Sequence, residues 1–191
     1  RYAEENGSYG LTTLEKQHVH LDGTAVSFSY AAKSGQEVEV TVRDERVCEI
    51  LRTLRHRRGG GDRLLAYKVN GRWQGIDADD VNGYIKELLG AEYSAKDFRT
   101  WRGTAIAALA LARSKADTMT ARKRAVTRAM ETVSEHLGNT PTIARSSYVD
   151  PRVIDLFNDG VTVKAGHSRA APGATISRTL ERQVLRMLRR A

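Results

Sequence analysis

The sequence predicts an α+β fold that is mainly α-helical and carries a small antiparallel three-stranded sheet near its N-terminus. Polar and apolar residues alternate between about residues 16 and 42, which is the period of half-buried strands. After residue 43, apolar residues recur at helical spacing instead. Residues 104–112 are almost wholly apolar, which is typical of a helix buried on all sides. We therefore expect a helical core around that run, preceded by the sheet.

The expected sheet is a three-stranded meander. Its second and third strands are marked by Val26, Phe28 and Tyr30, and by Val38, Val40 and Val42. The turn between these strands contains Lys33, close to Gly35. A lysine at a hairpin tip is usually only solubilising. The same position would also let Lys33 reach a bound partner.

Helices are expected over most of the remaining chain, at about residues 44–56, 77–90, 94–112, 120–137 and 177–190, with a short hairpin around 64–71. Gly138 ends the fourth helix. The last helix carries five arginines, and it could pack as a cap or lie on nucleic acid.

Two proline-containing helix starts surround Tyr148. Thr140-Pro141 and Asp150-Pro151 each place an N-cap residue before a proline at the first helical position. Tyr148 therefore lies at the joint between two short helices. A tyrosine there is either a packing residue or a hydroxyl presented to a partner.

The composition favours a polyanionic partner. The chain has 31 Lys and Arg against 23 Asp and Glu, a net charge of +8, and nucleic acid is the commonest partner of so basic a protein. A merely basic soluble protein is the alternative. No run of eighteen apolar residues predicts a membrane span, and no Cys/His cluster predicts a metal site. The single cysteine, Cys48, is expected to be a buried thiol.

The basic residues near the start of the helix at 94–112 point to an anion. Lys96, Arg99 and Arg102 recur every three residues there, although cations at a helix N-terminus oppose the helix dipole. A tyrosine hydroxyl can attack a phosphodiester if cations stabilise the extra charge and an acid protonates the leaving oxygen. The residue types that this chemistry needs are present as Tyr148, Arg99, Asn139 and Lys33. Spacing alone does not assemble them.

Five segments in consistent order resemble the poxvirus-like and bacterial type IB DNA topoisomerases. They are residues 2–14 (YAEENGSYGLTTL), 33–35 (KSG), 76–84 (IDADDVNGY), 96–101 (KDFRTW) and 139–148 (NTPTIARSSY). The resemblance covers about residues 1–160. It implies a helical catalytic core of the DNA breaking-rejoining kind in residues 1–160, followed by a basic C-terminal tail over 161–191. The family's N-terminal clamp domain is expected to be absent from this chain.

The resemblance also implies roles for individual residues. Tyr148 would be the nucleophile that forms a 3′-phosphotyrosyl bond, and Lys33 would protonate the 5′-oxygen. Arg99 would bind a nonbridging oxygen, and Asn139 would donate a hydrogen bond where the viral enzymes have histidine. Lys96, Tyr2 and Arg145 are expected to contact DNA.

The reaction implied is relaxation of supercoiled double-stranded DNA by a monomer that needs no cofactor, ATP or metal. The expected location is the cytoplasm, in association with the nucleoid. The family has a further catalytic arginine before the segment that begins at Tyr2, and Arg1 is too close to Tyr2 to be that residue. We therefore expect this chain by itself to bind DNA and to cleave it slowly or not at all. The alternatives are a tyrosine recombinase, or a non-catalytic basic DNA-binding module in which Tyr148 only packs.

Overall fold

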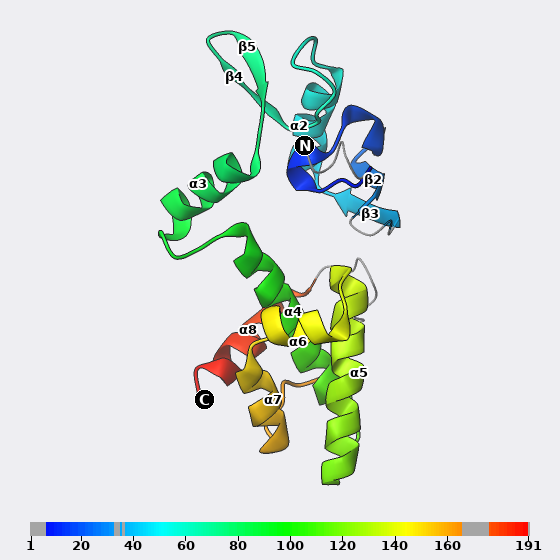
Figure 1. Cartoon of the computed structure of the whole chain (residues 1–191), viewed down its shortest axis with the longest axis vertical. Coiled ribbons are helices and arrows are strands. Elements are labelled where there is room, and N and C mark those ends of the chain that lie inside the picture. Colours follow the sequence, from blue (N-terminus) through cyan, green and yellow to red (C-terminus); the bar gives the residue numbers. More distant parts are fainter. Residues whose placement is uncertain (1–6, 33–34, 36, 166–175, 191) are drawn as a thin grey trace. The chain divides into compact units, whose positions relative to one another are not determined.

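The computed structural model describes residues 7–32, 35, 37–165 and 176–190 (Figure 1). Contacts divide the chain into two compact units, Arg1–Glu92 and Tyr93–Ala191, which are described one at a time. The predicted α+β class is confirmed. The first unit holds a three-stranded antiparallel sheet, and the regular elements described in the second unit are all helices.

The sheet of the first unit pairs β1 (Val19–Asp22), β2 (Ala25–Ala31) and β3 (Glu37–Arg43) in that order. Phe28 in the central strand pairs with Val19 on one side and Val40 on the other. The predicted meander is confirmed from residue 19 onward. Residues 16–18, expected at its start, form the 3-10 turn η2 (Lys16–His18) instead, and η1 (Leu11–Thr13) is a second such turn.

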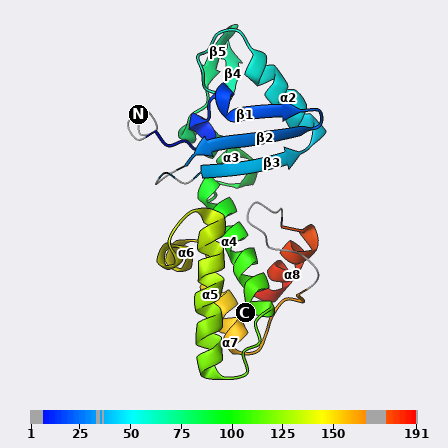
Figure 2. The same ribbon diagram turned by 90° about the vertical axis from the view of Figure 1, so that its right-hand side faces the viewer.

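One helix covers this sheet. Asp44 caps α2 (Glu45–His56) by accepting a hydrogen bond from the backbone N–H of Val47 at 3.0 Å. Figure 2 shows the three strands side by side with α2 beside them. The core of this unit consists of buried side chains from the sheet, from α2 and from two connecting segments: Leu14, Val19, Val26, Cys48, Leu51 and Leu64. Cys48 is buried, as predicted.

A hairpin and a helix complete the first unit. β4 (Ala66–Val69) and β5 (Arg72–Gly75) are joined by Asn70 and Gly71, whose φ angles of 49° and 79° suit a two-residue hairpin turn. Asp77 caps α3 (Ala78–Leu89) through a capping box with Asp80.

The second unit is built around α4 (Ala95–Ala112), which is buried at Gly103–Leu109 and at Leu111. This confirms the prediction that the apolar run of this helix is buried in the core. α5 (Met119–Leu137), α6 (Pro141–Ser147), α7 (Pro151–Asn158) and α8 (Arg178–Leu188) pack around it. Both views place α5 and α8 on opposite sides of α4 (Figures 1 and 2).

α8 belongs to the core of the second unit. Leu180, Val184, Met187 and Leu188 are buried there together with residues of α4, α5 and α7. The expectation of a catalytic domain ending at residue 160 stays a prediction, because packing alone does not delimit a catalytic domain. In the described part of the chain, no helix is long and apolar enough to cross a membrane.

Candidate active site

Tyr148 lies at the joint between α6 and α7, as the two helix starts predicted. Thr140 caps α6 by accepting from the N–H of Ile143 at 3.3 Å, and Pro141 opens the helix. Tyr148 is the C-cap residue of α6, with φ −134° and ψ 4°, and its N–H still donates to the carbonyl of Ala144. The side chain is partly exposed. The tyrosine is thus anchored through its backbone while part of its side chain stays accessible.

One face of α4 holds this joint. Thr104 accepts a hydrogen bond from the N–H of Asp150 at 3.0 Å, and the hydroxyl of Thr100 lies 3.5 Å from the carbonyl oxygen of Ser147. Gly103 lies between these threonines on the same face, since residues three and four apart are neighbours on a helix. A Cβ at Gly103 would lie 2.3 Å from the carbonyl oxygen of Tyr148. The glycine is therefore needed for the backbone of the joint to reach the helix.

The same face continues towards the N-terminus of α4 with two cations. The guanidinium carbon of Arg99 lies 5.1 Å from the ring centroid of Tyr148, and the Lys96 ammonium lies 5.9 Å from it. Both distances are within cation–π range. The sequence predicted that these two side chains lie near a bound anion, and the structure places both of them beside Tyr148.

Arg99 also connects α4 to the end of α5. Its Nη2 donates a 2.6 Å hydrogen bond to the carbonyl oxygen of Leu137, the last residue of α5. The last carbonyls of a helix have no partner within the helix and carry partial negative charge, so a guanidinium is a favourable partner there. A guanidinium has five N–H donors, so this bond leaves others for an anion.

Asn139 follows directly after α5 and Gly138, whose left-handed conformation ends the helix. The Oδ1 and Nδ2 atoms of Asn139 are both buried, and neither has a hydrogen-bond partner among the described residues. A buried amide without partners costs free energy, and such groups call for an explanation in function or in ligand binding. Asn139 thus offers a hydrogen-bond donor and an acceptor two residues after Leu137, whose carbonyl Arg99 contacts.

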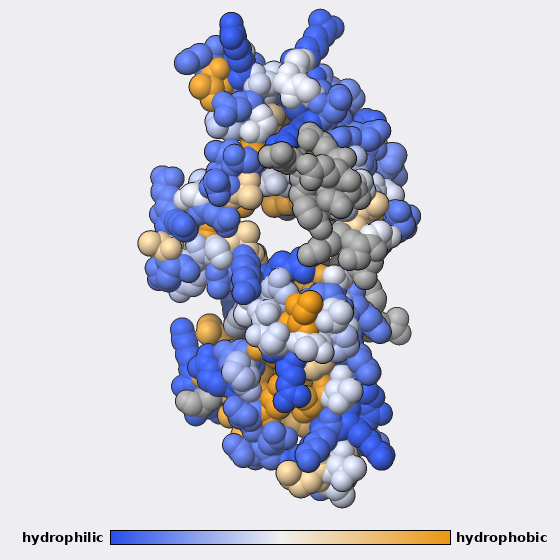
Figure 3. Space-filling view, viewed as in Figure 1, coloured by the Kyte–Doolittle hydropathy of each residue, from blue (hydrophilic) through white to orange (hydrophobic). Residues whose placement is uncertain are grey.

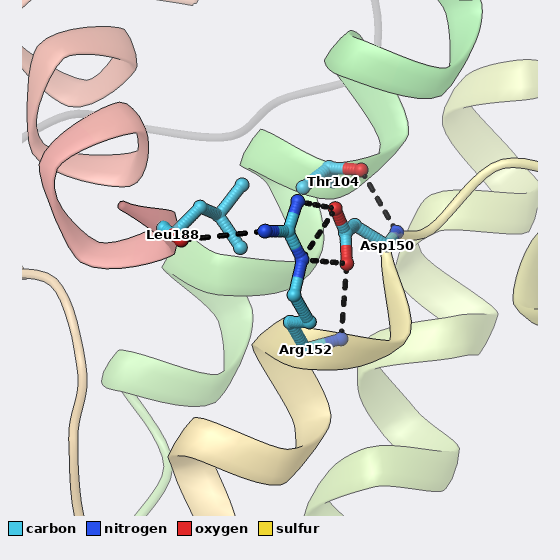
Figure 4. Close-up of polar contacts among 4 residues, drawn as sticks. All are labelled: Thr104, Asp150, Arg152 and Leu188. Atoms are coloured by element: carbon cyan, nitrogen blue, oxygen red, sulfur yellow. Dashed lines mark hydrogen bonds and ion pairs between the residues drawn. The ribbon is translucent and has the colours of Figure 1, made fainter. Parts of the chain in front are cut away.

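Asp150 and Arg152 fix the chain just beyond Tyr148, and sequence reasoning did not find this pair. Asp150 accepts from the N–H of Arg152 at 3.0 Å as an N-cap, and its carboxylate pairs with the guanidinium at 2.7 Å. Figure 4 shows the same guanidinium reaching the carbonyl of Leu188 at the end of α8, and the N–H of Asp150 reaching Thr104. The hydrogen bond from Arg152 holds the pKa of Asp150 below its ordinary value. The sequence signal that could have indicated this pair is an aspartate two positions before an arginine.

Two predicted site residues, Lys33 and Tyr2, lie outside the described residues. Arg145 is exposed on α6, near its end. Figure 3 shows apolar atoms over α6 within a largely hydrophilic surface, and Ile143 on that helix is 47% exposed. Among the described residues, no three His, Cys, Asp or Glu side chains lie together as a metal site would require.

Comparison with known proteins places this chain in a family. The model of the eukaryotic DNA topoisomerase I catalytic core matches residues 1–175. A relative from Acanthamoeba polyphaga mimivirus, described as DNA topoisomerase 1B, is 27% identical over 181 residues. The alignment covers 90% of this chain and 53% of the relative, so the chain spans about half the length of the relative that it matches. The chain belongs to the family of the eukaryotic DNA topoisomerase I catalytic core, the type IB DNA topoisomerases.

Proposed function

We propose that the protein relaxes supercoiled DNA by cutting and rejoining one strand of a duplex. The Tyr148 oxygen attacks a backbone phosphorus and loses its proton, and the bond from phosphorus to the 5′-oxygen breaks. The products are a 3′-phosphotyrosyl bond and a free 5′-hydroxyl, and the reverse reaction rejoins the strand. One observation carries the proposal: two cations of α4 lie over Tyr148, whose backbone the same helix holds.

Arg99 is the proposed oxyanion ligand. Its guanidinium is already held beside Tyr148 by the carbonyl of Leu137, so little reorganisation is needed when a phosphate arrives. Its remaining N–H groups suit the nonbridging oxygens of the crowded phosphorus, because a planar guanidinium can donate two parallel hydrogen bonds. Lys96 adds a second positive charge, 5.9 Å from the centroid of the same ring.

Asn139 is the proposed neutral donor. Its buried amide has no hydrogen-bond partner in the described part of the chain, which suits a group that is to bind a phosphate oxygen. A neutral donor makes a weaker hydrogen bond to an oxyanion than a charged one does. We therefore assign Asn139 a smaller share of the transition-state stabilisation than Arg99.

Lys33, which lies outside the described residues, is the proposed acid that protonates the leaving 5′-oxygen. Cleavage exchanges one phosphodiester for another, so the bond energy is kept in the phosphotyrosyl link. The proposed reaction therefore requires no ATP. We assign the stabilisation of charge that a metal ion could supply to Arg99 and Lys96, and so propose a reaction without a metal ion. We propose double-stranded DNA as the partner of a monomer that acts in the cytoplasm with the nucleoid, and Lys96, Tyr2 and Arg145 as DNA contacts.

The test is supercoil relaxation by the intact protein in EDTA and without ATP. Tyr148→Phe should abolish relaxation, and it should abolish the covalent adduct with a 5′-labelled strand, while DNA affinity stays close to that of the wild type. Tyr84→Phe is the matched control, because Tyr84 is an exposed tyrosine on α3. A Tyr148→Phe variant that still relaxes DNA would show that the mechanism is wrong. If the Tyr84→Phe variant also lost relaxation, the loss in Tyr148→Phe could not be attributed to the nucleophile.

A further inference from the structure

α8 is held in one rotational setting about its own axis. Its buried stripe of Leu180, Val184, Met187 and Leu188 packs into the core. One flank is fixed by Glu181, which accepts from the indole N–H of Trp101 on α4 at 3.2 Å. The other flank is fixed by Gln183, which accepts from the N–H of Lys164 at 2.9 Å. Rotation of the helix would break both bonds and expose the stripe.

This setting turns four arginines away from the core. Arg178, Arg182, Arg186 and Arg189 are all exposed, and their spacing places them on the side of α8 opposite the buried stripe. We call these four side chains the arginine face. At about 1.5 Å per residue it extends over roughly 16 Å. No hydrogen bond or ion pair engages these side chains within the described part of the chain.

No carboxylate of the described residues forms an ion pair with the arginine face. Glu181, the only acidic residue of α8, is turned to the flank where it binds Trp101. The exposed basic residues of α5, namely Lys123, Arg124 and Arg128, share their helix with Glu131 and Glu135, which are also exposed. The two helices therefore differ in local charge although both are rich in cations.

The geometry points to the arginine face as a second DNA-backbone contact, separate from the Tyr148 site. Arginines in a row offer bidentate hydrogen bonds to successive phosphates, and a 16 Å row matches about five nucleotides of one strand along the duplex axis. An anionic membrane is the poorer fit, because a helix that lies on a bilayer inserts its apolar side, and here that side is buried in the core. The inference concerns binding and does not depend on the proposed chemistry of Tyr148.

The contact is separate because α8 and the joint use different sides of α4. The joint packs on Thr100, Gly103 and Thr104, whereas α8 is bonded to Trp101. Trp101 lies more than 90° around the helix axis from the middle of the three residues that hold the joint, at about 100° per residue. DNA held by the arginine face would therefore be bound by a helix that is attached to another side of α4 than the joint.

The test compares two triple variants of the intact protein. Arg178→Gln/Arg182→Gln/Arg186→Gln removes three charges from α8, and Lys123→Gln/Arg124→Gln/Arg128→Gln removes three from α5. All six side chains are at or near the surface, and glutamine is a good helix former, so both variants should fold. Affinity for a short fluorescent duplex is measured between about 50 and 200 mM salt, where log K falls with log salt in proportion to the phosphates contacted. Circular dichroism confirms that each variant is folded.

We expect the α8 variant to have a salt dependence shallower by about two to three, and an affinity at least about tenfold lower at the low-salt end. The α5 variant should change the slope by less than about one. Equal slopes for the two variants would overturn the inference, and so would a loss of binding to phosphatidylserine vesicles with no change for DNA. At saturating DNA, the covalent adduct should still form in the α8 variant. Failure of Tyr148→Phe to abolish that adduct refutes the proposed chemistry alone, whereas an unchanged slope refutes the second contact alone.

Discussion

Gly103→Ala is the sharpest test of how the nucleophile is held. The added methyl group would lie 2.3 Å from the carbonyl oxygen of Tyr148 and 3.2 Å from Cδ1 of Leu137. Real Cβ atoms essentially never approach closer than 3.0 Å, so the Tyr148 carbonyl or α4 must retreat by about 0.7 Å or more. The carbonyl belongs to the backbone, and Thr104 binds the N–H of the very next peptide, that of Asp150, so a side-chain rotation cannot relieve the clash.

Two free-energy terms oppose each other in this variant. Forcing a methyl group into a filled space costs about 1–3 kcal/mol. Replacing glycine by alanine inside a helix returns about 1 kcal/mol. We therefore expect Gly103→Ala to be less stable than the wild type by about 0–2 kcal/mol. The larger effect should be on catalysis, where a misplacement of about 1 Å can cost roughly 100-fold in rate.

Gly83→Ala is the matched control. Gly83 lies inside α3, and a Cβ there would have nothing within 4 Å, so this variant should gain about 0.5–1 kcal/mol and keep its cleavage rate. Urea unfolding measures the stability of both variants, and single-turnover formation of the covalent adduct measures cleavage by the intact protein. If both glycine substitutions stabilise the protein equally, or if Gly103→Ala cleaves at the wild-type rate, the close approach does not position Tyr148.

Two further variants test the neighbours of Tyr148. Because Arg152 lowers the pKa of Asp150, the pair stabilises the fold above the ordinary aspartate pKa of about 3.9, and this contribution is lost as the pH falls through the lower folded value. Wild type should therefore exceed Asp150→Asn in stability at neutral pH, with the difference shrinking in acid during urea titrations; a difference independent of pH would contradict this. Asn139→Ala removes two buried polar atoms that have no partner among residues 7–32, 35, 37–165 and 176–190. The melting temperature of this variant should therefore stay equal or rise while cleavage slows by about 100-fold. A lower melting temperature with unchanged cleavage would show that the amide is structural.

Most of the fold could be predicted from local patterns. Strand alternation, helix periodicity and capping residues are properties of neighbours in sequence, and they located the meander, the buried α4 and the joint at Tyr148. The error at residues 16–18 was also local. His18 continues the alternation of β1 in sequence, but its Nδ1 accepts from the N–H of Glu15 at 3.0 Å and helps to form the turn η2 instead.

The contacts that hold the candidate site could not be predicted in the same way. Gly103 meets Tyr148, Arg99 meets Leu137 and Arg152 meets Leu188 across separations of more than thirty residues. Nothing in the neighbourhood of Gly103 distinguishes it from a glycine that merely weakens a helix. Asn139 was found by family resemblance, whereas Arg99 was also singled out by its place near the start of its helix. The structure adds a physical reason for each: a helix-end carbonyl that holds the guanidinium, and a buried amide without a partner among the described residues.

The groups of the candidate site are attached to two different helices, α4 and α5. Lys96 and Arg99 share one helix face with Thr100, Gly103 and Thr104, so the cations and the backbone next to the nucleophile are attached to the same helix. Asn139 is attached differently, through Gly138 to the end of α5, so its distance from Tyr148 depends on how α5 packs against α4. Leu137 connects the two helices. Its carbonyl accepts a hydrogen bond from Arg99, and its Cδ1 is the side-chain atom nearest to the position of a Cβ at Gly103. A bulkier residue at position 103 would therefore displace both the Tyr148 backbone and the end of α5 that precedes Asn139. Arg99 could not then keep both its hydrogen bond to Leu137 and its place beside Tyr148.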